Sequence, residues 1–355
     1  MPHSLRVVAL TGKRSDPSGR FRIAAYAGPL KSMGIRLIVR PSKISKYPPV
    51  EKWLRPLWLP AAVASRAPDA FSTWASDVTL LSREMISTLE TWEPLTKRPR
   101  ILDIDDAIWL HQRGHSVASL ARRVESVIAG NDFLADWLSR FNRNVTILPT
   151  PVDTSLFRPA SSGRAAGNDP ELRREPQPLM IGWQGTSSNL KYLYMIEGAL
   201  AAILKKYQGA RVRVVCDRPP RFSSLPADRI EFIRWSEQNE VIAMQGTSVG
   251  LMPLDDSDWS RGKCGYKMLL YLACGIPAVV SPVGMNAQVL SRTDAAMAAA
   301  SLADWENCLD HLLASPALRS EMGSRGRRFV EAEFSLTGLA PRMADILRRA
   351  AGADR

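Results

Sequence analysis

Positively charged side chains gather in one short stretch of the sequence, directly before an apolar segment. Arg261, Lys263 and Lys267 fall within the sequence RGKCGYK. Arginine forks and lysine point charges both bind phosphate groups. The stretch therefore predicts a binding site for an anion, such as the diphosphate of a nucleotide.

The residues after the basic stretch predict a helix, a stop and a buried strand. Apolar residues recur at helical spacing from Met268 onward, and Gly275 with Pro277 ends the helix. Residues 278–281 are apolar and β-branched, as in a strand buried on both faces. Ligands of open α/β sheets bind beyond the carboxyl ends of such strands, at the start of the next helix. The candidates for contacts there are Gly284, Met285 and Asn286.

This segment resembles the donor-binding element of GT-B glycosyltransferases, in the retaining group of the family 4 or group 1 type. The matching positions are Lys267, Tyr271, Ala273, Gly275, Pro277, Val279, Val280, Ser281 and Gly284. Two positions depart from the pattern: the acid that contacts the donor ribose in such enzymes is here Leu270, and the second acid would fall at Gly262. The resemblance implies that Tyr271 belongs to the donor-binding set.

The fold that the resemblance implies is α/β, of the GT-B type, with two Rossmann-like domains facing each other across a cleft. A length of 355 residues suits two domains. We expect an acceptor-side domain at 1–157, and a linker at 158–178 that is rich in Ser, Gly, Arg, Glu and Pro. The donor-side domain is expected at 179–335, and a C-terminal helix at 336–355 should return to the first domain.

The donor-side domain opens with a predicted strand, a loop of small polar residues and a helix. Backbone amides in such a loop can bind a diphosphate. The expected donor contacts are Gly182, Gly185, Thr186 and Lys191. The resemblance aligns Lys191 with a lysine of the family, whereas Trp183 stands where the family has an arginine. The basic stretch at 261–267 could supply that missing cation, and Lys191 could instead be an ordinary exposed lysine.

Three carboxylates cluster at the end of another predicted strand, in the order Asp103, Asp105 and Asp106. Asp103 and Asp105 match the DxD signature of metal-dependent GT-A enzymes. By position, Asp105 and Asp106 also resemble a His–Asp pair of GT-B enzymes, which implies contact with sugar hydroxyls or proton acceptance. Helix capping is the alternative. We expect no metal and no other cofactor, because positive side chains and amides can stabilise a leaving diphosphate.

A glycine loop follows the first predicted strand, at 5–10, and contains Gly19, Arg20 and Arg22. The resembled family commonly has such a loop facing the cleft, and the two arginines could bind phosphate. They could equally be surface residues at the start of a helix. The loop lacks the GxGxxG pattern, so a dinucleotide is not indicated.

Residues 46–60 combine tryptophans, leucines and basic residues. Trp53 and Trp58 would share one helical side, and Pro56 and Pro60 are expected to interrupt a regular helix. Aromatic rings with basic flanks suit the interface of an anionic membrane. Packing against the amino-terminal domain is the alternative interpretation.

The composition narrows the class of protein. The net charge of +12 predicts anionic partners, but the arginines are dispersed and form no basic-aromatic motif, which argues against nucleic acid. The sequence contains no apolar run long enough to span a membrane, no signal peptide and no CxxC pair among its four cysteines. These features predict a reduced, cytoplasmic protein.

The resemblance implies an enzyme of the hexosyltransferase type, active in polysaccharide biosynthesis. It would transfer a sugar from a nucleotide-sugar donor to a glycan, lipid-linked or other acceptor, with retention and without an essential metal. A peripheral position on the inner face of the membrane would suit residues 46–60. The residues assigned to catalysis are Asp105, Asp106, Lys191 and Lys267. The alternatives are a nucleotide-sugar epimerase, a phosphorylase, or a binding protein that has lost catalysis, as the departures at Leu270 and Gly262 would allow.

Overall fold

The computed structural model describes residues 4–110, 114–160 and 178–352, and it divides the chain into two compact units. Unit 1 comprises Met1–Pro151, Arg261–Cys264 and Phe334–Arg355, and unit 2 comprises Val152–Ser260 and Gly265–Glu333. Apart from the short segment 261–264, the chain changes unit at 151/152 and 333/334, whereas the sequence predicts boundaries after 157 and 335. Residues 161–177, most of the expected linker, lie outside the described residues.

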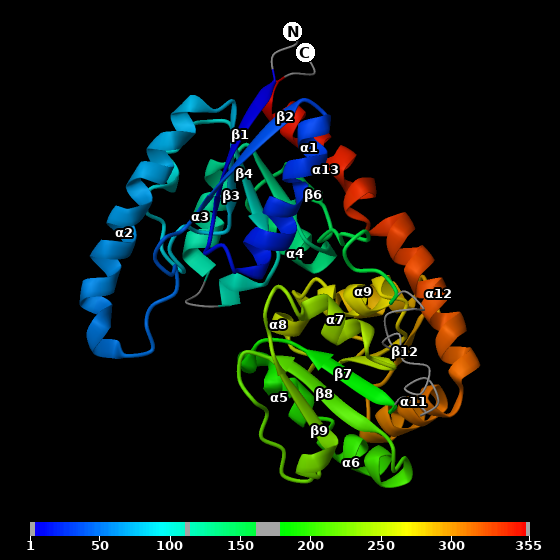
Figure 1. Ribbon diagram of the computed structural model, residues 1–355. Helices are drawn as coiled ribbons and strands as arrows, with labels where there is room; N and C mark the ends of the chain where they lie inside the picture. The colour runs from blue at the N-terminus through cyan, green and yellow to red at the C-terminus, as the bar shows by residue number, and fades with distance from the viewer. Residues whose placement is uncertain (1–3, 111–113, 161–177, 353–355) are drawn as a thin grey trace. The chain divides into compact units, whose positions relative to one another are not determined.

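Unit 1 is built on a parallel six-stranded sheet of order β2-β1-β3-β4-β5-β6 (Figure 1). The strands are β1 Leu5–Thr11, β2 Ile35–Pro41, β3 Val78–Ser82, β4 Arg100–Ile104, β5 Ser126–Ala129 and β6 Val145–Ile147. The helices are η1 Ser18–Ile23, η2 Ala24–Tyr26, α1 Ala27–Ser32, η3 Lys52–Leu54, α2 Arg55–Ser72, η4 Thr73–Ala75, η5 Glu93–Leu95, η6 Ile108–Leu110, α3 His115–Arg123, α4 Asp132–Leu138 and α13 Leu336–Ala351.

Unit 2 contains a second parallel sheet of order β12-β11-β10-β7-β8-β9. Its strands are β7 Met180–Gln184, β8 Arg211–Cys216, β9 Ile230–Arg234, β10 Val249–Met252, β11 Ala278–Val280 and β12 Ala296–Ala298. Its helices are η8 Ser187–Asn189, α5 Leu190–Tyr194, α6 Glu197–Lys206, η9 Ala227–Arg229, α7 Glu240–Gln245, α8 Asp258–Arg261, α9 Tyr266–Ala273, α10 Met285–Leu290, α11 Leu302–Ala314 and α12 Pro316–Glu333.

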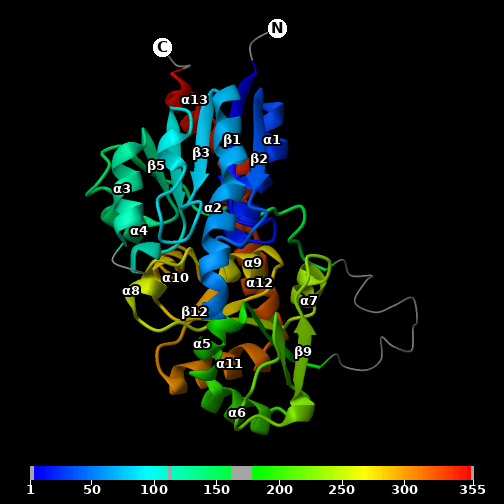
Figure 2. The same ribbon diagram turned by 90° about the vertical axis from the view of Figure 1, so that its left-hand side faces the viewer.

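The central strands of both sheets are apolar because helices cover both of their faces. Every residue of β3, β4, β7 and β10 is buried. In unit 1, α1 and α13 cover one face of the sheet and α2 lies on the other (Figures 1 and 2). Two parallel six-stranded sheets with helices confirm the predicted α/β class and its two Rossmann-like domains.

Helix α13, near the end of the chain, completes the core of unit 1. Leu339, Met343 and Leu347 are buried in one apolar cluster with Val7 of β1 and Val78 of β3. Strands from the first part of the sequence and a helix from the last part thus form one core.

Helix α2 differs from the prediction. It runs without a break from Arg55 to Ser72 and contains Pro60 and Pro68, although the sequence predicted an interruption at Pro56 and Pro60. Pro56 lies in the first helical turn, where no N–H group is needed. Pro60 and Pro68 lie at exposed positions, so the carbonyl groups that they leave without a donor can be hydrated.

Candidate functional site

The sheet order of unit 2 predicts where a ligand binds. From β7 the chain adds β8 and β9 on one side, and later β10 and β11 on the other. The loops after β7 and β10 therefore diverge at the carboxyl edge of the sheet, which is the topological switch point where open α/β sheets bind ligands.

Lys267, in the first turn of α9, reaches the loop that follows β7. Its Nζ lies 5.2 Å from the ring centroid of Trp183, which is buried. A Cβ atom added to Gly185 would lie 3.0 Å from this Nζ and 2.7 Å from the Trp183 ring. The positive charge of Lys267 thus lies next to Gly185 of the loop, at the switch point, and near the ring of Trp183.

The loop after β7 has fewer available backbone amides than the sequence suggested. The N–H of Gly185 donates to Val215 O at 3.0 Å, and the N–H of Ser187 donates to Asp217 Oδ1 at 2.6 Å. The side chain of Thr186 is exposed, and its Oγ1 lies 3.0 Å from Ser188 Oγ. The loop therefore presents hydroxyl groups directly after Gly185, where two of its amides are already bonded to protein oxygens.

Lys191 lies at the start of α5 and is exposed. Its Nζ lies 4.7 Å from the ring centroid of Tyr192. Burial alone would raise the pKa of Asp255, but hydrogen bonds from Ser257 and Ser260 and the charge of Lys191 lower it below its ordinary value. The lysine after β7 thus interacts electrostatically with the acid after β10, across the switch point.

Tyr271 and Gly182 are structural, contrary to the predicted donor contact. Tyr271 is buried, and its hydroxyl donates to Gly182 O at 3.0 Å. A Cβ atom on Gly250 would lie 2.3 Å from the Tyr271 ring, and one on Gly182 would lie 2.5 Å from Thr247. Both residues thus help to fix α9 against the sheet, and the Tyr271 hydroxyl is used in this contact.

The segment after β11 is also more buried than expected. Asn286 is fully buried, its Nδ2 donates to Ser281 O at 3.1 Å, and its backbone N–H donates to Val283 O. Met285 is buried as well, so both side chains hold the loop and do not reach solvent. Gly284 has a φ of 55°, which an L side chain rarely adopts. A donor contact by Gly284 stays a prediction.

In unit 1, Arg22 and Asp103 form a buried ion pair. Arg22 donates through Nε and Nη2 to both Asp103 oxygens at 2.6–3.2 Å, and through Nη1 to Thr150 Oγ1 at 3.1 Å. Burial alone would lower the pKa of Arg22, but Asp103 raises it above its ordinary value. The guanidinium is thus occupied by protein groups, which corrects its assignment to phosphate.

Gly19 and Arg20 are the other two candidates for a phosphate contact in that loop. Gly19 is buried, and a Cβ atom there would lie 3.2 Å from Thr11. Arg20 is half-buried, with its guanidinium carbon 4.5 Å from the ring centroid of Phe21. A phosphate contact by Gly19 or Arg20 stays a prediction.

Asp105 and Asp106 are joined by Arg83, a residue that the sequence reasoning missed. Arg83 Nε donates to Asp105 Oδ1 and Nη2 donates to Asp106 Oδ2, both at 2.6 Å. Burial alone would raise the pKa of Asp105, but Arg83 and then Arg22 lower it. Asp105 is thus ionised and weakly basic, which suits hydrogen bonding to a hydroxyl better than proton abstraction. Arg83 directly follows the predicted strand at 77–82, a position that could have identified it.

Residues Arg261–Cys264 belong to unit 1 and not, with Lys267, to unit 2. The buried Asn131 donates through Nδ2 to Lys263 O at 3.1 Å and to Gly262 O at 3.3 Å. Cys264 Sγ donates to Asp105 O at 3.2 Å, and burial raises the pKa of this thiol to about 12. The predicted grouping of Arg261 and Lys263 with Lys267 around one anion is therefore not seen within either unit.

Gly262, where the resembled family has an acid, lies against Ala107. A Cβ atom there would lie 2.6 Å from Ala107 Cβ. We expect Gly262→Glu to lower the free energy of unfolding by about 1–3 kcal/mol because the side chain overpacks this contact. Urea unfolding measures the loss, and Gly209→Glu is the matched control, because a Cβ atom on Gly209 meets nothing within 4 Å. Equal stability of the two variants would contradict the packing role.

The described residues contain no group of three or more His, Cys, Asp or Glu side chains that could hold a metal ion. Within the DxD triplet, Asp103 is bound by Arg22 and Asp105 by Arg83. The carboxylates that could have held a cation are thus neutralised by guanidinium groups.

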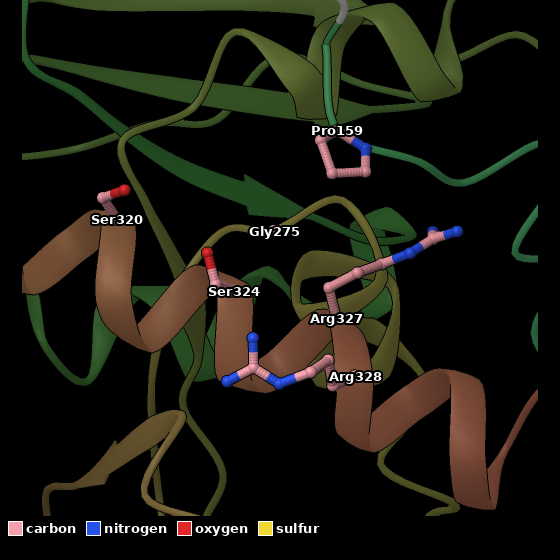
Figure 3. A pocket seen from close by; sticks show the side chains of 6 residues that line it. All are labelled: Pro159, Gly275, Ser320, Ser324, Arg327 and Arg328. Carbon is pink, nitrogen blue, oxygen red and sulfur yellow. The ribbon is translucent and has the colours of Figure 1, made fainter.

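A cavity of about 390 Å³ lies in unit 2, apart from Lys267. It is lined by Pro159, Gly275, Ser320, Ser324, Arg327 and Arg328, and Figure 3 shows the last four along α12. Gly275 follows the carboxyl end of α9, whereas Lys267 lies in its first turn. Arg327 donates to Ala273 O at 2.8 Å and to Phe157 O at 2.6 Å. The cavity therefore lies at the other end of α9 from the candidate donor site.

Comparisons with known proteins concern the family and the fold of the chain. The model of the glycosyl transferase-like family matches residues 197–347. No curated protein sequence matches the chain. Solved structures match over nearly the whole chain at low sequence identity, which shows a shared fold.

Three of these structures illustrate the likeness. Sucrose-phosphate synthase from Thermosynechococcus elongatus is 14% identical with a TM-score of 0.69, over 98% of this chain and 100% of that one. HepE from Anabaena, in complex with UDP and glucose, is 13% identical with a TM-score of 0.70, over 96% and 98%. WaaG, a glycosyltransferase involved in lipopolysaccharide biosynthesis, is 14% identical with a TM-score of 0.67, over 97% and 99%. The chain thus has the GT-B-type α/β fold of these structures, and its residues 197–347 match the model of the glycosyl transferase-like family.

Proposed function

We propose that this chain is a glycosyltransferase that binds a nucleoside-diphosphate sugar in unit 2, at the carboxyl edge of its sheet. The observation that carries the proposal is the position of Lys267 Nζ, which lies close to both the Trp183 ring and Gly185 of the loop at the switch point. A fixed positive charge there can stabilise the diphosphate as it leaves the sugar. Lys191 is proposed as a second, more mobile cation at the same edge, because it is exposed.

The acceptor is proposed to bind in unit 1, through hydrogen bonds from its hydroxyl groups to Asp106 and Asp105. The Asp106 side chain is 27% exposed and that of Asp105 12%, so Asp106 is the more accessible acceptor of a hydrogen bond. Arg83 positions both carboxylates. We propose a reaction of polysaccharide biosynthesis, which the likeness to WaaG, a glycosyltransferase involved in lipopolysaccharide biosynthesis, supports. A glycan or lipid-linked glycan at the cytoplasmic membrane face is the acceptor that we propose.

The reaction is proposed to retain the configuration of the sugar and to need no metal. Guanidinium groups occupy the carboxylates Asp103 and Asp105, and Lys267 supplies positive charge at the proposed diphosphate position. UDP-glucose is the first donor to test, since HepE was solved with UDP and glucose.

Thermal unfolding with a panel of nucleoside diphosphates and their sugars tests this proposal. A ligand at about one hundred times its dissociation constant adds about 2.7 kcal/mol of stability, or several degrees. We expect one nucleoside diphosphate to raise the melting temperature equally in magnesium and in EDTA. A shift that EDTA abolishes would contradict metal independence, and no shift from any nucleotide would contradict the donor site.

A non-catalytic binding protein is the second candidate, and two positions favour it. Leu270 and Gly262 stand where the resembled family has two acids, and neither carries a carboxylate that could contact ribose. Leu270 is buried, and Gly262 packs against Ala107. Incubation of the full chain with the bound nucleotide sugar separates the two functions. Release of free nucleoside diphosphate in the presence of a glycan acceptor supports transfer, whereas binding without turnover supports the second candidate.

A further inference from the structure

Helix α2 presents an apolar face to solvent. Leu57 is 70% exposed and Phe71 56%, and Trp53, in η3 directly before the helix, is 74% exposed. The three residues lie at helical spacing on one side of the segment. Trp74, just beyond the helix, is 62% exposed. The exposed positions between them on this side are Pro60, Ala61, Ala64 and Pro68. We call this set, from Trp53 to Trp74, the outer face of α2.

The charges of α2 lie on the opposite side of the helix. Arg66 is buried and its Nη1 donates to Asp69 Oδ2 at 2.7 Å, and Arg55 donates through Nε to Pro49 O. A helix on the surface of a globular protein normally turns its charges to water and its apolar residues inward. The outer face of α2 has the reverse pattern, and contiguous exposed apolar surface of this kind marks an interaction site.

Apolar exposure is concentrated in this part of the chain. Of the fifteen large apolar side chains that are exposed among the described residues, seven fall between residues 47 and 74. They are Tyr47, Val50, Trp53, Leu57, Leu59, Phe71 and Trp74. Figures 1 and 2 show α2 as the outermost element on its side of unit 1.

The charges and ring positions favour a lipid surface as the occupant. Lys43 and Lys52 are exposed at the amino end of the helix, against the single exposed acid Glu51 there. Tryptophan rings at both ends of an in-plane helix suit the depth of lipid head groups, where basic side chains meet anionic lipids. The middle of the outer face carries only alanine and proline, so it offers no large side chain to fill a protein groove.

We propose that α2 docks unit 1 on an anionic bilayer, lying in the plane of the head groups with its outer face toward the acyl chains. No helix among the described residues is long and apolar enough to cross a membrane, and this docking requires none. The carbonyl groups left without donors by Pro60 and Pro68 would remain in the hydrated head-group layer. The proposal concerns a surface of unit 1 and does not depend on the donor site in unit 2.

Co-sedimentation of the full chain with vesicles tests the docking. The vesicles are phosphatidylcholine alone, or phosphatidylcholine with about one-third phosphatidylglycerol, in about 0.1 M and about 0.5 M salt. We expect binding to the anionic vesicles that weakens at the higher salt, and weak binding to the neutral ones. Binding to neither kind of vesicle would overturn the proposal.

A triple variant assigns the binding to the outer face. Trp53→Ser with Leu57→Ser and Phe71→Ser should weaken vesicle binding by about tenfold or more, because its apolar contact area is lost. The matched control places three serines at exposed apolar residues of unit 2: Ile242, Met195 and Leu302. Vesicle binding by the triple variant equal to that of the control would overturn the assignment.

Two further measurements distinguish lipid docking from self-association and from damage to the donor site. Sedimentation velocity without lipid should show the same species for the wild type and the triple variant. A wild-type dimer that the triple variant loses would show that a second copy covers the outer face and would overturn the lipid proposal. Nucleotide-induced thermal shifts should be equal in both proteins, so failure of the donor site is distinguishable from failure of docking.

Discussion

Replacing Lys267 with alanine is expected to weaken the binding of a nucleoside diphosphate by about tenfold to a hundredfold. A hydrogen bond to a charged group is worth about 1.5–3 kcal/mol, and each 1.4 kcal/mol is a factor of ten. Because negative charge develops on the leaving diphosphate, kcat/KM should fall further, by about 100-fold to 1,000-fold. Isothermal titration and initial rates with the nucleotide sugar measure the two losses.

The control for this variant is Lys205→Ala, which removes another lysine of unit 2. Lys205 is exposed on α6 and lies away from the switch point. The long-range charge change is the same, so only the local interaction differs. If Lys267→Ala and Lys205→Ala bind the nucleotide equally well, the donor site lies elsewhere in the chain.

Replacing Arg22 with methionine is expected to lower the free energy of unfolding by about 3–5 kcal/mol. The change leaves the Asp103 carboxylate buried without its counter-ion, which is the costly way to break a buried ion pair. For a unit of this size each kcal/mol corresponds to about 2–4 °C, so melting should begin about 10 °C lower. Urea unfolding followed by tryptophan fluorescence measures the change in free energy.

Two further variants interpret the result for Arg22. Arg22→Met with Asp103→Leu removes both charges and should recover much of the lost stability. Arg325→Met breaks ion pairs with Asp294 and Glu321 at the surface, and it should cost less than about 1 kcal/mol. A loss at Arg22 no larger than the loss at Arg325 would show that the buried pair does not stabilise unit 1.

The strands and their edges could be predicted from the sequence because buried parallel strands are short and apolar. Segments such as 77–82 and 249–253 correspond to β3 and β10, and the polar residues that follow mark the carboxyl edge. The strand β12, with the sequence Ala-Met-Ala, was missed because it has no β-branched residue. The sequence predicted a break at Pro60 because the helix propensity of proline is low. Propensity does not take into account that the carbonyl group left without a donor faces water, where it can be hydrated.

The direction of each side chain could not be predicted from the sequence. Tyr271 matches the family pattern and yet points into the sheet, where its hydroxyl meets Gly182 O. For Arg22 the sequence left phosphate binding and a surface position open, and it did not indicate the buried partner Asp103, which is 81 residues away along the chain. Spacing shows which residues share an edge of a sheet, whereas packing decides which of them a ligand can reach.

The position of α13 has a consequence for synthesis on the ribosome. Leu339, Met343 and Leu347 are buried against β1 and β3, so the apolar face of the first sheet stays uncovered until almost the whole chain has been made. At about 5–20 residues per second, this face waits for tens of seconds after β1 emerges. During that time chaperones can bind the exposed apolar face of the nascent sheet, and this face can also cause aggregation. The core is complete only when the last helix has left the ribosome.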